Sequence, residues 1–251
     1  MNKEFEKFIN DFTPKLQYCK TAPQVIDLVD RYTFNHPCLY YASGHLCCFM
    51  DAPEISLKLL RKAISFGTIL PNDYWDTQSS DCIGSSVVDL FTYFKIQQNE
   101  TATKLIILGY SYLSNCIEII GNNAFESFEN RGRLFDMSGK STYIISDALH
   151  TLSQIKIVYS IPDYLDASHG YMTHGFYNAA NNVYKRASYL HEYLEDITVA
   201  GKSANIYSLE EIAEIGRQRH KELYLSFKKD VVNSKYNISK HELDNLFDSI
   251  Q

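Results

Sequence analysis

Glycine and proline are scarce in this 251-residue sequence, which contains eleven glycines and six prolines. Proteins average roughly 7% glycine and 5% proline, and both residues fall well below those levels here. Tight turns depend on these two residues, so their scarcity argues against a β-sandwich, a β-propeller or a collagen-like chain. Long helices joined by few breaks fit the composition better.

An excess of positive charge is also missing, because 24 Lys and Arg oppose 30 Asp and Glu for a net charge of −6. Binding nucleic acid without regard to sequence needs clustered basic residues, so we expect no nucleic-acid partner. No stretch approaches the roughly 18 consecutive apolar residues of a membrane span, and we expect no membrane association. The first residues mix charges and lack the apolar segment of a signal peptide. We therefore expect a cytoplasmic protein whose six cysteines are reduced thiols.

Apolar residues recur at intervals of three and four along nearly the whole sequence, which predicts helices and no strand. Pro37 and Pro53 each suit the first turn of a helix, and they open two antiparallel helices over 37–50 and 53–66. Pro14 is expected to kink or break the first helix. Further helices are predicted over about 81–94, 101–121, 124–136 and 141–158, with loops over 67–80 and 160–171. Ser80 or Asp81 is expected to cap the first of these helices, and the second is expected to start at Asn99 or Thr101 and to end at Gly121.

Two longer helices follow the second loop and are expected to form a hairpin over about 172–197 and 209–227. A short helix over 238–250 ends the chain. The predicted fold is all-α, with an array of antiparallel helix pairs over residues 1–160. Residues 161–251 add the C-terminal hairpin and the terminal helix, packed with the array as one unit.

Small and apolar residues recur at similar positions in several of these helices. The first set is Tyr40, Gly44, Ser56, Leu60 and Ala63; the second is Gly109, Leu113 and Cys116; the third is Phe128, Gly132 and Phe135. This pattern resembles the tetratricopeptide repeat over about residues 37–160, although Ala63 and Cys116 lie further apart than one 34-residue repeat. The resemblance implies an α-solenoid in which small residues let paired helices approach closely.

Motifs for cofactor or metal chemistry are absent from the sequence. There is no phosphate-binding loop, no Glu-x-x-His pair of a di-iron bundle and no zinc-ligand spacing. His45 and Cys48 would share one helix face, but no second ligand pair accompanies them, so core packing is the favoured interpretation. We expect no cofactor and no metal.

One polar segment carries the ingredients of acid–base chemistry. Residues 163–177 contain Asp163, Asp166, His169 and His174, and a carboxylate there could orient an imidazole as a general base. We expect this segment to fall at the junction between the array and the hairpin, where sites often lie. It supports an alternative hypothesis, a helical enzyme or small-molecule-binding protein. An ordinary loop whose Asp and Ser cap the next helix is the competing interpretation.

Negative charge concentrates in residues 71–130, where eight acidic residues face only Lys95 and Lys104. The leading hypothesis is therefore a non-catalytic scaffold or adaptor whose helical groove binds a protein or a basic peptide. The expected partner-binding residues are Asp73, Trp75, Asp76 and Asp81. A solvated acidic face is the competing interpretation. A homodimer paired along residues 172–197 is a third hypothesis.

Overall fold

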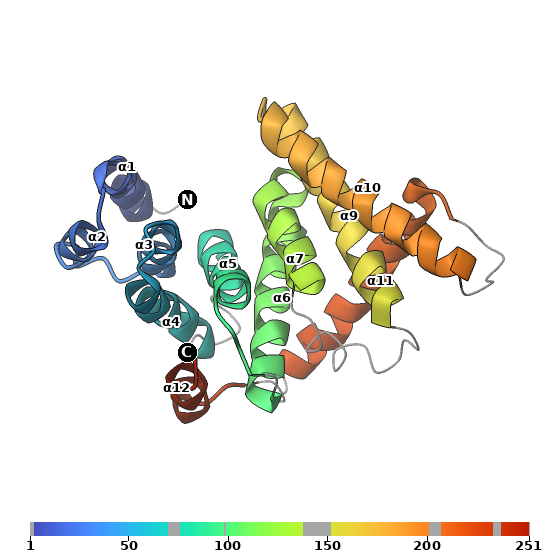
Figure 1. Ribbon diagram of the computed structural model, residues 1–251. Helices are drawn as coiled ribbons and strands as arrows, with labels where there is room; N and C mark the ends of the chain where they lie inside the picture. The colour runs from blue at the N-terminus through green and yellow to red at the C-terminus, as the bar shows by residue number, and fades with distance from the viewer. Residues whose placement is uncertain are drawn as a thin grey trace.

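The computed structural model describes residues 3–69, 76–97, 99–137, 152–200, 207–232 and 237–250. Every regular element in these residues is helical, which confirms the predicted all-α class (Figure 1). The elements are α1 (Lys3–Tyr18), α2 (Ala22–Val29), α3 (Pro37–Phe49), α4 (Pro53–Ile69), α5 (Thr77–Tyr93), α6 (Glu100–Ile120), the 3-10 turn η2 (Gly121–Asn123), α7 (Phe125–Met137), α9 (Leu152–Thr173), α10 (Tyr177–Ala200), α11 (Leu209–Val232) and α12 (Lys240–Asp248).

Several helix ends lie where the sequence predicts them. Helix α3 begins at Pro37 and α4 begins at Pro53, each proline occupying a position where no helical hydrogen bond from its nitrogen is needed. The Asn99 side chain caps α6 by accepting a hydrogen bond from the backbone N–H of Ala102 at 2.8 Å. Gly121 ends α6 with a positive φ of 56°, a conformation that favours glycine.

Two predicted breaks are wrong. Helix α1 continues through Pro14, and α9 continues through the whole of 160–171, including Pro162 and Gly170. Gly170 is a point of close approach, because a Cβ there would lie 2.4 Å from Phe125 Cβ. The chain turns instead at Gly175, where φ is +82°. Tertiary packing of α9 thus outweighs the local helix-breaking tendency of both residues.

Three helix pairs cross at small residues. In α3–α4, the Ser56 hydroxyl donates to the Gly44 carbonyl at 2.9 Å. In α5–α6, a Cβ on Gly84 would lie 3.1 Å from the backbone oxygen of Gly109. In α7–α9, the Ser160 hydroxyl donates to the Gly132 carbonyl at 3.0 Å. The crossings are close because these positions carry at most a hydroxymethyl group.

Each pair packs on the next one along the chain. Helix α5 contacts both α3 and α4, and α7 contacts both α5 and α6 (Figure 1). The two long C-terminal helices are present, but they do not pack along one another as the predicted hairpin; in the described residues α10 and α11 each pack against α9. The apolar stripe of α10 is buried within the chain at Val183, Ala187 and Leu190. Helix α12 returns to α4 and α6, where Leu243, Leu246 and Phe247 are buried.

The expectation that all six cysteines are reduced is also wrong. Cys38 of α3 and Cys82 of α5 form a disulfide, with their Cα atoms 5.2 Å apart and 44 residues between them in sequence. Adjacent packing of α3 and α5 brings the two residues together. The remaining four cysteines are free: Cys19, Cys47, Cys48 and Cys116.

None of the helices in the described ranges combines the length and apolar character that a membrane span requires.

Candidate functional site

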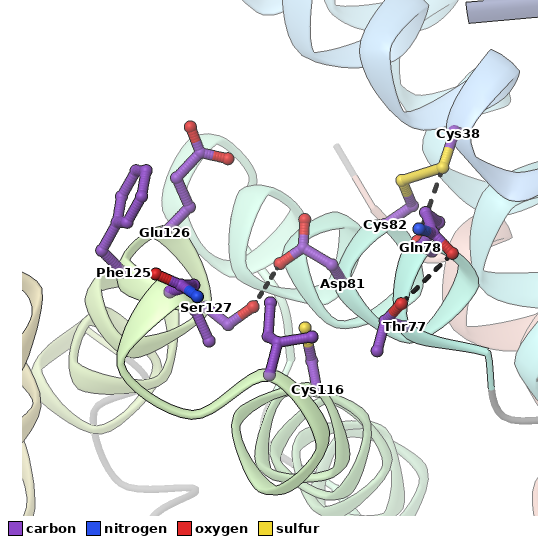
Figure 2. Close-up of a pocket in the computed structure, with 12 residues that line it drawn as sticks. Cys38, Thr77, Gln78, Asp81, Cys82, Cys116, Phe125, Glu126 and Ser127 are labelled. Carbon is purple, nitrogen blue, oxygen red and sulfur yellow. Dashed lines mark hydrogen bonds between the residues drawn. A yellow bond between two sulfur atoms is a disulfide. The ribbon is translucent and has the colours of Figure 1, made fainter. Parts of the chain in front are cut away.

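A pocket of about 290 Å³ lies where the N-terminal ends of α5 and α7 meet the C-terminal end of α6 (Figure 2). Its walls are largely apolar, with two carboxylates among them. The lining residues are Cys38 from α3; Thr77, Gln78, Asp81 and Cys82 from α5; Cys116 and Ile120 from α6; Asn123 from η2 and Ala124 after it; and Phe125, Glu126 and Ser127 from the first turn of α7.

Asp81 and Glu126 give the pocket its charge. Asp81 is half-buried, and its Oδ1 accepts a hydrogen bond from the Ser127 hydroxyl at 2.6 Å. Burial raises the pKa of Asp81 above its ordinary value, and the Ser127 hydrogen bond opposes that shift. Glu126 lies exposed at the rim of the pocket. Its pKa is nevertheless raised, because neighbouring protein atoms displace part of its hydration and because Asp81 and Glu129 carry the same charge. Three carboxylates therefore share one electrostatic neighbourhood.

No lysine or arginine ion pair joins Asp81 or Glu126 within the described part of the chain. The third carboxylate, Glu129, accepts a hydrogen bond from the Tyr171 hydroxyl at 2.6 Å. Two acids thus face the pocket and its rim without an ion pair to lysine or arginine in the described residues. A ligand that supplies positive charge would reduce the mutual repulsion.

A chain of hydrogen bonds fixes the start of α5 against the start of α3. The Asp76 carboxylate caps α5, accepting from the backbone N–H and the hydroxyl of Ser79, both at 2.8 Å. His36 caps α3, its Nδ1 accepting from the Cys38 N–H at 3.2 Å, and its Nε2 lies 3.2 Å from Ser79 Oγ. Burial lowers the pKa of His36, which favours the neutral imidazole that this cap requires.

Two of the four predicted partner-binding residues lie within the described part of the chain. Asp73 and Trp75 lie outside the described residues. Asp76 is used as the α5 cap, which moves the helix start four residues before Ser80 and five before Asp81, the two predicted caps. Asp81 lies inside α5 and lines the pocket.

The rest of the acidic stretch does not form one surface. Asp89 is buried, and its Oδ2 lies 2.6 Å from His45 Nδ1. Glu100 forms an ion pair of 3.3 Å with Lys104, and both residues belong to α6. Folding therefore selects Asp81, Glu126 and Glu129 from the eight acids of residues 71–130.

The alternative set in residues 163–177 does not converge on one point. Asp163 is buried and binds the Arg131 guanidinium through two hydrogen bonds of 2.9 and 2.7 Å. Asp166 pairs with Arg217 at 2.7 Å near the surface. His169 is exposed, and the His174 ring packs against Phe125 with 4.8 Å between centroids. Asp163, Asp166 and His169 point in different directions around the continuous helix α9, and His174 follows the end of that helix at Thr173.

Sequence reasoning missed most of the pocket. Glu126 entered only as one acid of the charged stretch, while Ser127, Cys116 and the Cys38–Cys82 pair carried no spacing that linked them to Asp81. Their convergence depends on the packing of four separate helices. Within the described ranges, no group of three or more His, Cys, Asp or Glu residues is arranged to hold a metal ion.

Comparison with known protein families, with curated proteins and with solved structures finds no match for this chain.

Proposed function

We propose that this chain is a non-catalytic interaction scaffold that binds a basic segment of a partner protein. The observation that carries the proposal is the pocket between α5 and α7, where neither Asp81 nor Glu126 forms an ion pair with a lysine or arginine in the described structure. The partner segment would place a lysine or arginine in this pocket.

The helix pairs support a tetratricopeptide-like array as the framework. Within the pairs α3–α4, α5–α6 and α7–α9, the helices cross closely at Gly44–Ser56, Gly84–Gly109 and Gly132–Ser160. Seven residues after the second member of each crossing, the buried positions are Ala63, Cys116 and Ala167. A common spacing of small residues aligns the first helices α3, α5 and α7, and arrays of this kind present an extended binding surface.

The chemistry of the pocket fits the side chain of lysine or arginine. Ile120, Ala124 and Phe125 offer apolar contact for the methylene stem. Asp81 and Glu126 offer acceptors for the ammonium or guanidinium head. Since both carboxylates have a raised pKa, an added positive charge would lower it again and stabilise their ionised form.

The proposal is tested by titrating a library of fluorescent lysine- and arginine-containing peptides against the full chain. For the best binder, Asp81→Asn and Glu126→Gln should each weaken binding about tenfold, equivalent to ~1.4 kcal/mol. Glu54→Gln is the matched control. Glu54 is exposed in the first turn of α4, so its substitution removes the same charge at a position away from the pocket. Equal affinity in all three variants, or no binding by any basic peptide, would overturn the proposal.

A further inference from the structure

We propose that the Cys38–Cys82 disulfide forms part of the pocket wall and controls the pocket through its redox state. Small thiols reduce this bond by entering the pocket itself. The inference rests on the proposed function, since the pocket that changes is the proposed binding site.

The disulfide belongs to the pocket by position. Cys38 and Cys82 both line it, and Asp81 precedes Cys82 directly. Figure 2 shows the two sulfur atoms at one end of the site, with Phe125 and Glu126 at the other end. The bond therefore lies beside the carboxylate proposed to contact the partner.

The contacts between α3 and α5 explain why opening this bond would act locally. At the end away from the pocket, the buried Asp89 carboxylate lies 2.6 Å from His45 Nδ1. At the pocket end, the disulfide is accompanied by the 3.2 Å contact between His36 and Ser79. Reduction would remove the covalent link at the pocket end and leave the His45–Asp89 contact in place. The first turns of α5, which carry Asp81, would then gain freedom relative to α3.

The free thiol in the pocket does not perform this reaction. Cys116 is buried, and burial raises its pKa to about 11. The reactive species in disulfide exchange is the thiolate, so Cys116 stays protonated and unreactive near neutral pH. An external thiol is therefore the reductant.

The exchange proceeds in two balanced steps. An external thiolate attacks one sulfur of the Cys38–Cys82 bond, forms a mixed disulfide and releases the other sulfur as a thiolate, which takes up a proton. A second external thiolate then attacks the mixed disulfide and releases the second protein sulfur, which is also protonated. Two electrons pass to the protein, and the two external thiols leave as their own disulfide.

The negative charge of the pocket provides a specific test of whether thiols reach the disulfide through the pocket. Asp81 and Glu126 lie along the approach to the bond, so an anionic thiol is repelled and a cationic thiol is attracted. A disulfide reduced from another side of the chain, or only after unfolding, would not sense these two carboxylates.

The first experiment measures the rate of reduction of the full chain by cysteamine and by thioglycolate at low salt. Each rate is divided by the rate of the same thiol on a small-molecule disulfide. We expect a preference for cysteamine of about tenfold, which salt screens. The double variant Asp81→Asn/Glu126→Gln should lose the preference, and Glu54→Gln should keep it. An equal normalised rate for both thiols in the unmodified chain would overturn reduction through the pocket.

The second experiment compares hydrogen exchange in the oxidised and the thiol-reduced chain, with Cys38→Ser/Cys82→Ser as an independent form without the bond. Amides in the first turns of α5 should exchange about tenfold faster without the disulfide through local opening, while those of α9 should change only as far as the loss of global stability speeds exchange through complete unfolding. Affinity for a basic peptide should fall about fivefold or more, the usual scale of coupling between two events.

The two readouts separate this inference from the proposed function. If exchange at α5 is the same in oxidised and reduced chains, redox control is wrong whatever the peptide does. If exchange quickens at α5 but the peptide binds neither form, redox control stands and the proposed ligand is wrong.

Discussion

Two aspartates on different helices of this protein have opposite surroundings. Asp163 of α9 is buried, and the Arg131 guanidinium binds both of its oxygens. Asp81 of α5 is half-buried beside a pocket, and its described partner is the Ser127 hydroxyl. Burial raises the pKa of both carboxyl groups, but only Asp163 has a cation that opposes the shift. A paired buried carboxylate holds helices together, whereas a carboxylate that lacks a cation is available to a ligand.

The Arg131–Asp163 pair belongs to a larger cluster of buried polar contacts, which Asp81 lacks. Arg131 also donates to Ser114 Oγ at 3.0 Å, and His220 Nε2 lies 3.3 Å from Asp163 and donates to the Tyr159 carbonyl at 2.8 Å. These groups connect α6, α7, α9 and α11. The cluster of Arg131, Asp163 and His220 thus serves stability, and the pocket around Asp81 is better placed to serve binding.

The largest effect is expected from Asp163→Asn. The substitution leaves the buried Arg131 charge without its counter-charge, so the free energy of unfolding should fall by about 3–5 kcal/mol. Urea denaturation followed by circular dichroism measures this loss. A loss below about 1 kcal/mol, the size typical of an exposed pair, would remove the distinction between the two aspartates.

Removal of the disulfide in Cys38→Ser/Cys82→Ser should come next. A cross-link closing a loop of this length restricts the unfolded chain, so its removal should cost about 2–4 kcal/mol. The same urea measurement on the oxidised parent and the variant gives the difference. Cys19→Ser, which removes a free thiol on the N-terminal side, is the control and should be nearly neutral. Equal stability of parent and double variant would contradict the prediction.

The buried cluster, unlike the pocket, should make the protein less stable as the pH falls. Burial and the Arg131 charge lower the pKa of His220 well below its ordinary value. The unfolded chain therefore binds a proton that the folded chain does not, and stability should fall as pH drops below about 6.5, by up to ~1.4 kcal/mol per pH unit. His220→Gln should flatten this slope between pH 6.5 and 5. His36, whose pKa is also lowered, contributes a slope of the same sign that remains in the variant. An unchanged slope in the variant would show that His220 is not the responsible group.

The smallest stability effect is expected from Asp81→Asn. The asparagine can still accept the hydrogen bond from Ser127, and the change removes a charge that burial disfavours. Because the pKa of Asp81 is raised on folding, its charge destabilises the folded chain above the ordinary carboxyl pKa, and this cost is relieved as pH falls. Stability at pH 7 should therefore stay within about 0.5 kcal/mol of the parent or rise slightly. A loss comparable to that of Asp163→Asn would assign Asp81 to the scaffold.

Local signals in the sequence located much of the helical framework. Pro37, Pro53, Asn99 and Gly121 mark helix ends correctly, because capping and proline geometry depend on the few residues beside them. The same kind of signal failed at Pro162, since the packing of α9 against α7, α10 and α11 outweighs the local cost of a proline.

The candidate site was predicted only in part. Asp81 was identified from the concentration of negative charge in residues 71–130, but nothing in that count distinguished it from Asp89, which is buried against His45. Glu126 and the Cys38–Cys82 pair join Asp81 only through helix packing. The residues 163–177 looked like a site because they are close in sequence. Helix α9 spreads Asp163, Asp166 and His169 over different faces, and His174 lies beyond its end.

The low glycine and proline content and the three-to-four spacing of apolar residues determined the all-helical class of this protein, because helix formation is controlled by neighbours along the chain. The pocket, the disulfide and the different roles of Asp81 and Asp163 were decided by tertiary structure. Close crossings at Gly44, Gly84 and Gly132 set how the helix pairs lie, and hence which distant side chains meet. Whether a carboxylate finds an arginine or a pocket depends on that packing, which no local pattern encodes.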